Sequence, residues 1–303
     1  MSDRRRYLLR RIAERRQELL DRREAGILSR VDKVIREVWN NVFSAVTRGG
    51  RIAVDAARKA MAGLPDRLKF VIGDALAGLH NYAFTGTVTD IVEKLTEKDR
   101  ANLVRSAINH GIITPTSPGV PPPFTVPSVA ETVGVVFPPP PAAVVDAIVY
   151  AGNWSDRIAK ITKLADPDKV AAAVSRSYTN GTPPSALAKE LRPILQNVQS
   201  SVRRVVRDQT SYVSQTARMQ AYDGLGDLVI GHQIHAVPKT KYSRPAHLKR
   251  SGTCYYKKPK PGQLGLDQMP RPPYESNGEL AYGCRCYLTP LLRPPMDIPA
   301  FPG

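Results

Sequence analysis

The stretch VQSSVRRVVRDQTSYVSQTARMQAYDGLGDLVIGHQIHAV, residues 198–237, contains the change of hydrophobic period that decides the fold class. In its first part, apolar residues recur at three- and four-residue steps and therefore share one face of a helix. These residues are Val198, Val202, Val205, Val206, Tyr212 and Val213. The pattern predicts a helix from about Asn197 to Tyr222 that stops at Gly224. The following DLVIGHQIHAV alternates and is rich in β-branched residues, which predicts a strand.

The first hundred residues have a helical period. One face of the first predicted helix collects Leu28, Val31, Ile35, Val38, Val42 and Val46. Gly49 and Gly50 end this pattern. The preceding RRRYLLRRIAERRQELLDRRE is either a solvated helix supported by i,i+4 pairs or an arm that becomes ordered on a partner. Further helices are predicted at about 52–62, 66–80 and 89–109.

The middle of the chain has a different composition. Ten of the 27 prolines lie in 112–141, and no Lys or Arg occurs between Arg105 and Arg157. Such a segment is extended or forms polyproline II. One interpretation is a flexible linker. The other is an arm that lies on another surface, because the segment also contains many Val and Phe residues.

Together these patterns predict an α+β protein with three parts. The first is a mostly α-helical N-terminal region, residues 1–111, with an Arg-rich first helix. The second is a Pro-rich extended connector, residues 112–142. The third is an α+β domain with a small antiparallel sheet, residues 143–303, in which GELAYGCRCYLTPLL forms the last strand.

Charge and cysteine content limit the class of protein. The 303-residue chain has a formal charge of +17 and a pI of about 10.0, which indicates a polyanion as partner, most simply nucleic acid. Three cysteines are too few for a disulfide-framed secreted module. The N-terminal segment lacks the apolar core of a secretory signal. Residues 106–130 carry no charged side chain, but their six prolines argue against a membrane span.

The three cysteines and one histidine suggest a metal site. Cys254, Cys284 and Cys286 with His247 provide the four ligands that a structural zinc ion requires. Cys284 and Cys286 point to the same side of a strand, and the final strand could return beside the 247–254 loop. The alternatives are packed, reduced thiols, or a disulfide between Cys254 and one of the pair.

Two other histidines, His232 and His235 in HQIH, resemble a chelating pair. On the predicted strand they face opposite sides of the sheet. We therefore expect two ordinary half-buried or surface imidazoles instead of metal ligands.

A basic segment without carboxylates predicts phosphate binding. From Leu228 to Leu266 the chain contains no Asp or Glu. Its cations are Lys239, Lys241, Arg244, Lys249, Arg250, Lys257, Lys258 and Lys260. Tyr242, Tyr255 and Tyr256 lie among them and could stack on unpaired bases. Binding of this kind is salt-sensitive and independent of sequence. The alternative is a solvated basic loop that docks on an acidic protein ring.

Enzymatic motifs are absent from the sequence. It contains no Gly-x-Ser-x-Gly elbow, no Walker loop and no Glu-x-Glu pair, and the most basic region has no carboxylate to hold a catalytic metal. A nucleophilic pair of Cys254 with His247 is conceivable, but nothing distinguishes one thiol from the others. We therefore predict a non-catalytic protein.

The order of motifs in the C-terminal half resembles the Mu F-like minor head proteins of tailed bacteriophages. An Arg-Asp-Gln-Thr helix signature, an Arg-x-x-His turn, a Pro-Pro loop and a terminal Cys-Arg-Cys strand follow one another over about residues 150–292. The matching positions are Arg207, Asp208, Gln209, Thr210, Arg244, His247, Pro272, Pro273, Cys284, Arg285 and Cys286. The segment LKRSGTCYY keeps the glycine of the family's turn but lacks its acid or amide, and the tryptophan often found on the strand after the helix is absent.

The resemblance implies a head-morphogenesis protein of the virion. Such proteins lie in the capsid interior near the portal vertex after assembly in the host cytoplasm. They bind the portal protein, contact packaged double-stranded DNA and influence DNA packaging and ejection. The major capsid protein or a scaffolding protein is a further candidate partner, and no membrane is involved. An alternative from a different class is a free-standing, zinc-stabilised basic protein that binds nucleic acid.

Overall fold

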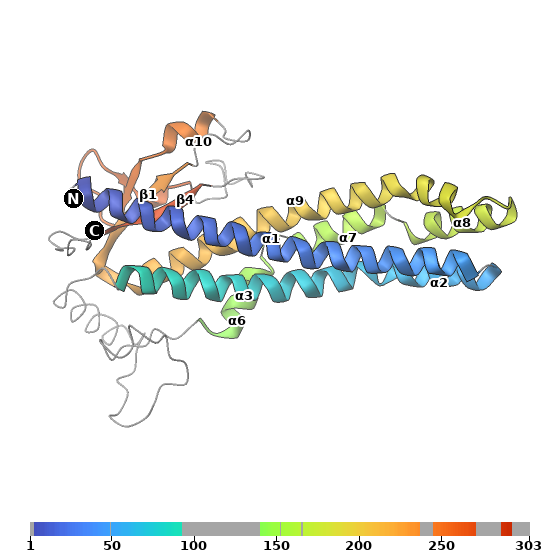
Figure 1. Cartoon of the computed structure of the whole chain (residues 1–303). Helices are drawn as coiled ribbons and strands as arrows, with labels where there is room; N and C mark the ends of the chain where they lie inside the picture. The colour runs from blue at the N-terminus through green and yellow to red at the C-terminus, as the bar shows by residue number, and fades with distance from the viewer. Residues whose placement is uncertain are drawn as a thin grey trace, which may run out of the picture. The chain divides into compact units, whose positions relative to one another are not determined.

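The computed structural model describes residues 3–48, 50–92, 140–151, 153–164, 166–236, 245–270 and 286–292. Its helices are α1 (Asp3–Arg48), α2 (Gly50–Ala62), α3 (Leu64–Val92), α6 (Ala142–Val149), α7 (Trp154–Leu164), α8 (Pro167–Thr179), α9 (Pro184–Gly224) and α10 (Pro245–Arg250). Its strands are β1 (Val229–His235), β2 (Cys254–Tyr256), β3 (Leu264–Gly265) and β4 (Tyr287–Leu292) (Figure 1). The predicted α+β class, with helices first and a small sheet near the C-terminus, is confirmed.

The chain divides into two compact units. Unit 1 comprises Met1–Asp21, Leu79–Val145 and Ser211–Gly303, and unit 2 comprises Arg22–Gly78 and Asp146–Thr210. Helices α1, α3, α6 and α9 each contribute residues to both units. Each unit therefore combines segments from both sides of the predicted Pro-rich connector, and the three-part division made from the sequence stays a prediction.

Unit 2 is a helical unit with an aliphatic core. The apolar face predicted for the first helix supplies Val31, Ile35 and Val38, all of them buried. Helix α3 adds Leu68 and Ile72 to the fully covered residues. Burying an aliphatic side chain of this size contributes about 1.5–3 kcal/mol. Most of the stability of these helices therefore comes from the packing of their apolar faces.

Polar contacts, one part-buried and one exposed, join the helices of unit 2. On α1, Asp32 accepts hydrogen bonds from Arg203 and, at 2.8 Å, from Gln199 Nε2 of α9. Arg58 Nε of α2 donates to Asp168 Oδ1 of α8 at 2.8 Å. The exposed pair of Arg58 with Asp168 contributes little energy, typically below about 1 kcal/mol.

The sheet belongs to unit 1 and has the strand order β3-β2-β1-β4. Strand β1 is antiparallel to both neighbours, with His232 opposite Tyr255 and Pro290. The β2–β3 pair is parallel, with Tyr255 opposite Leu264, so the sheet is mixed and the prediction of an antiparallel sheet was wrong at this edge. The physical reason is that residues 257–263 loop back, with Gly262 at a φ of 82°, instead of forming a hairpin.

Several helices are longer than the sequence predicted. The Arg-rich N-terminal segment and the following apolar helix form one continuous α1, and the helix predicted at 66–80 continues to Val92. Helix α9 likewise begins at Pro184 and includes Pro193 within its length. Its predicted stop at Gly224 is confirmed. The connector predicted at 112–142 lies outside the described residues, apart from 140–142. No helix in the described ranges combines the length and the apolar character that a membrane crossing requires.

Candidate functional site

A row of buried polar side chains on α9 faces the interior of unit 1. Gln215, Arg218 and Tyr222 are spaced by three and four residues and so lie on one side of the helix. All three are at most 3% exposed. We call these three residues the α9 polar face. Burying polar groups to this extent costs folding free energy unless they are hydrogen-bonded. The hydrogen-bond partners of these three residues are therefore informative.

Two residues of the α9 polar face cover the free edge of the sheet. Gln215 Nε2 donates to the Cys286 carbonyl oxygen at 3.1 Å, and the Tyr222 hydroxyl donates to the Leu288 carbonyl oxygen at 3.0 Å. Alternate residues of an edge strand point their backbone N–H and C=O groups away from the sheet. Pro290, which has no backbone N–H, takes the next such position after Cys286 and Leu288. Helix α9 thus satisfies two carbonyl groups at the β4 edge, and an edge covered in this way is less open to pairing with another chain.

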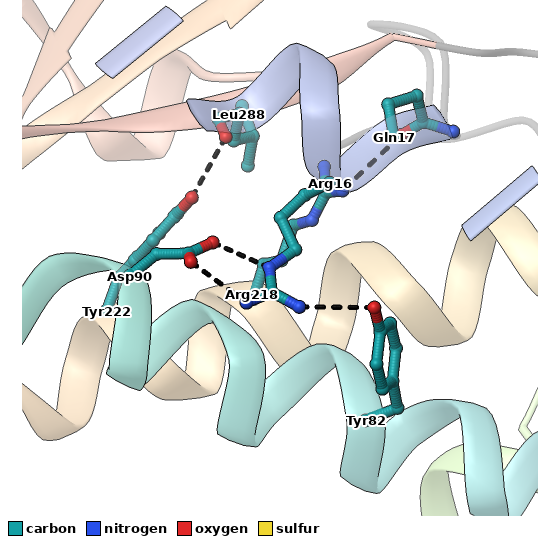
Figure 2. Close-up of polar contacts among 7 residues, drawn as sticks. All are labelled: Arg16, Gln17, Tyr82, Asp90, Arg218, Tyr222 and Leu288. Carbon is teal, nitrogen blue, oxygen red and sulfur yellow. Dashed lines mark hydrogen bonds and ion pairs between the residues drawn. The ribbon is translucent and has the colours of Figure 1, made fainter. Parts of the chain in front are cut away.

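A cluster of charged residues lies beside this face and joins α1 to α3 (Figure 2). Arg16 Nε donates to Asp90 Oδ2 at 2.6 Å, and Arg16 Nη2 donates to Asp90 Oδ1 at 2.9 Å. Arg16 Nη1 donates to the Tyr82 hydroxyl at 3.2 Å. This bidentate pairing raises the pKa of Arg16, mainly through the hydrogen bonds to Asp90. The geometry fixes the guanidinium plane against one carboxylate.

Gly86 makes room for this guanidinium. A Cβ atom at position 86 would lie 2.5 Å from Arg16 Nη1 and 2.6 Å from Arg16 Cζ. A methyl group at position 86 would therefore displace the Arg16 guanidinium from the place where Asp90 and Tyr82 hold it.

Arg218 lies next to this cluster and forms no ion pair with a carboxylate in the part of unit 1 that the structure describes. Its Nη2 donates to Gln17 Oε1 at 3.5 Å, which is a long contact. Burial is the main cause that lowers its pKa, and the neighbouring Arg16 charge adds to this effect. The pKa of Tyr222 is raised to about 12, again mainly by burial, so its hydroxyl keeps the proton that it donates to β4.

In unit 1, Cys286 of the Cys-Arg-Cys motif contacts His247 of the Arg-x-x-His motif. Cys286 lies immediately before β4, and its Sγ is 3.4 Å from Nδ1 of His247, on α10. The two residues are 39 positions apart and both are buried. The sequence-based expectation that the closing strand returns beside His247 is therefore confirmed for Cys286.

The four predicted metal ligands are only partly described. Cys254 begins β2, and its thiol donates to the Gly252 carbonyl oxygen at 3.7 Å. Within the described ranges, no group of three or more His, Cys, Asp or Glu residues is arranged to hold a metal ion. Cys284 and Arg285 lie outside those ranges, so the zinc site with four ligands stays a prediction.

His232 and His235 are more buried than expected. They are 1% and 8% exposed, so the expectation of half-buried or surface imidazoles was wrong. The His232 ring packs on Tyr222 at 5.4 Å between centroids. His235 Nε2 lies 2.9 Å from the Thr289 hydroxyl, and its ring stacks on Tyr287 at 5.2 Å. The reason is that helices cover β1, which an isolated strand pattern cannot reveal.

The lysines of the predicted basic segment are exposed where the structure describes them. Lys249, Lys258 and Lys260 are exposed, and so is Lys257, whose Nζ donates to the Gly226 carbonyl oxygen at 3.2 Å. Tyr255 is buried, so its ring is not available to stack on a base. The remaining members are Arg250 and Tyr256, which are half-buried, and Lys239, Lys241, Tyr242 and Arg244, which lie outside the described residues.

The helix signature of the resemblance lies in unit 2 and makes structural contacts there. Arg207 Nε is 3.5 Å from Glu24 Oε1. Arg157 Nη2 donates to Asp208 Oδ2 at 2.9 Å. Gln209 Nε2 donates to the backbone carbonyl oxygens of residues 149 and 151, at 3.2 and 3.0 Å, and so holds the end of α6. The fourth member, Thr210, is buried. In the described structure these residues position α9.

Sequence reasoning did not identify Arg16, Asp90 or the α9 polar face. The contacts they make connect α1, α3, α9 and β4 within unit 1. Scans of protein-family models, of curated proteins and of solved structures found no match to this chain.

We predict that Cys286→Ser destabilises unit 1 by about 1–3 kcal/mol, because a buried, packed sulfur beside His247 is replaced by a smaller and more polar oxygen. Cys254→Ser, at a half-buried position, is the matched control and should cost less. Urea unfolding followed by circular dichroism measures both. Equal losses for the two variants would contradict a special role for the Cys286–His247 contact.

Proposed function

We propose that this protein is a minor head protein of a tailed bacteriophage, of the Mu F-like type, and that it acts in head morphogenesis. In this proposal it binds the portal protein inside the capsid and contacts packaged DNA without sequence preference. Its proposed role is structural and not catalytic.

The observation that carries the proposal is the 3.4 Å contact between Cys286 Sγ and His247 Nδ1. The resemblance rests on an ordered series of motifs, and a series has meaning only if its members build one fold. Of the described members, His247 on α10 and Cys286 immediately before β4 meet at this contact. Asp208 and Gln209 of the helix signature also make specific contacts, with Arg157 Nη2 and with the backbone carbonyl oxygens of residues 149 and 151.

The charge distribution supports the DNA contact. The net charge of +17 favours a polyanion, and Lys249, Lys258 and Lys260 are exposed in the basic segment. Contacts of lysine with phosphate are independent of base sequence. Because the sheet's β4 edge is covered by α9, we expect partner binding to use helix surfaces and loops instead of strand addition.

The portal contact is tested by co-sedimentation of the purified chain with procapsids and with isolated portal rings. We expect binding to both. Failure to bind either, combined with sequence-specific DNA binding, would overturn the proposal. Zinc-dependent stability together with portal-independent DNA binding would favour the free-standing zinc-stabilised alternative.

The DNA contact predicts a steep salt dependence. Each phosphate neutralised contributes about 0.9 to the slope of log affinity against log salt concentration. Replacing Lys258 and Lys260 with Gln should therefore reduce this slope by about 2. Lys160→Gln with Lys163→Gln, at exposed positions of α7, is the matched control and should leave the slope nearly unchanged. A slope that falls equally in both double variants would contradict DNA contact through the basic segment.

A further inference from the structure

Arg218 is a buried guanidinium whose hydrogen bonds are incomplete. It is 2% exposed, and among the described residues its Nη1 has no hydrogen-bond partner. Its Nη2 reaches only Gln17 Oε1, at 3.5 Å. An arginine side chain keeps its proton under all ordinary conditions, so burial cannot be relieved by loss of the charge. A buried charge needs a partner of opposite sign to persist in a folded protein.

The carboxylate nearby is already used. Asp90 binds Arg16 with both of its oxygens, at 2.6 and 2.9 Å. The other groups that act on Arg218 electrostatically are Tyr222 and Tyr287, and the pKa of each hydroxyl is raised, chiefly by burial, so both are neutral. In the described part of unit 1, two guanidinium groups therefore share one carboxylate, which leaves one positive charge without compensation.

We propose that a small monovalent inorganic anion, of the size of chloride, binds at Nη1 of Arg218 inside unit 1. The ion supplies the missing negative charge and accepts the hydrogen bond that Nη1 has no other group to receive. Because Arg218 is only 2% exposed, a halide fits this position better than a larger phosphorylated or organic anion. Its role is to stabilise the junction of α1, α3 and α9 in unit 1.

A water molecule is the competing occupant. Gln215 Oε1, one turn before Arg218 on the same face, also lacks a hydrogen-bond partner, and water could accept from Nη1 while donating to this oxygen. Water is neutral, however, and would leave the net charge of the cluster unchanged. The two occupants therefore differ in a property that can be measured, which is the dependence of stability on the anion.

The first test is thermal unfolding in chloride–gluconate mixtures of constant ionic strength. We expect the midpoint to rise by roughly 2–4 °C for each tenfold increase in chloride above its dissociation constant. Arg218→Met, which keeps the length of the side chain without its charge, should remove this dependence. Arg204→Met, at an exposed position of α9, should keep it. Equal chloride dependence in the wild-type protein and Arg218→Met would overturn the proposal.

The second test uses the wild-type protein alone and so does not depend on how a variant folds. Crystals grown in bromide should give an anomalous peak within hydrogen-bonding distance of Arg218 Nη1. A peak that is absent there, with ordinary water density between Arg218 and Gln215, would overturn the anion site.

Discussion

Replacing Asp90 with Asn should destabilise unit 1 by about 2–4 kcal/mol. The change keeps the shape of the side chain but removes the carboxylate that binds Arg16 through two hydrogen bonds. The pair is mostly buried, with side-chain exposures of 19% for Arg16 and 22% for Asp90. Removing one partner of such a pair leaves a charge in a poorly solvated place, which is why the cost exceeds that of a surface ion pair.

The matched control is Asp74→Asn on the same helix. Asp74 pairs with Arg30 at 3.4 Å, and both side chains are more than half exposed. An exposed pair of this kind contributes at most about 1 kcal/mol. Urea unfolding measured for both variants gives the comparison. Similar losses for Asp90→Asn and Asp74→Asn would show that the Arg16 contact is no more important than an ordinary surface pair.

Two glycines on α3 provide a second comparison for the same contact. Alanine normally stabilises a helix relative to glycine, by about 0.5–1 kcal/mol. Gly78→Ala should follow this rule, because nothing lies within 4 Å of the added methyl group. Gly86→Ala should instead destabilise, because the methyl group would meet Arg16 Nη1. The change in unfolding free energy should therefore have opposite signs in the two variants if the Arg16 guanidinium lies beside Gly86 in solution.

Local hydrophobic period was sufficient to predict the buried faces. Val31, Ile35 and Val38 of α1 and Val202 and Val206 of α9 were assigned to buried faces from three- and four-residue spacing, and all are buried. Such spacing follows from the geometry of one helix and needs no knowledge of its partner. The same local reasoning failed at the start of α9, which was predicted near Asn197 but lies at Pro184, with Pro193 inside the helix.

The Arg16–Asp90–Arg218 cluster could not be predicted, because its members are far apart in sequence. Arg16 and Asp90 are 74 residues apart, and Arg218 and Gln17 are 201 apart. No local pattern specifies which of the 44 basic residues pairs with which of the 27 acidic ones. One usable signal was present: Ala217 and Ala221 continue the valine stripe of α9, and small side chains there allow neighbouring elements to approach closely.

The sequence predicted where the motif residues lie better than it predicted what they do. The contact of Cys286 with His247 was expected because a closing strand must return to the sheet that it completes. The role of Tyr255 was not, since its burial depends on the pairing of β2 with β1 and on the packing of the sheet. Asp208 and Gln209 belong to a motif, and the structure explains them as anchors of α9.

Lowering the pH from 7 to 4 should remove roughly 3 kcal/mol of stability through His235 alone. Burial is the main cause that lowers the pKa of His235 from 6.5 to about 4, with a further contribution from Arg10. The unfolded chain therefore binds a proton on this residue at a higher pH than the folded chain does. The contribution is fully present above about pH 6.5 and is lost as the pH falls to about 4.

The measurement is urea unfolding as a function of pH for the wild-type protein and His235→Gln, a neutral side chain that does not titrate and can still reach the Thr289 hydroxyl. The difference in unfolding free energy between the two proteins should shrink steadily between pH 6.5 and pH 4, because only the wild-type protein loses the contribution of a neutral imidazole. A nuclear magnetic resonance titration of the His235 ring provides an independent check, with an expected midpoint near pH 4. A midpoint near 6.5, or a constant difference between the two proteins, would mean that solvent reaches His235 and that the cover of β1 by neighbouring helices is open in solution.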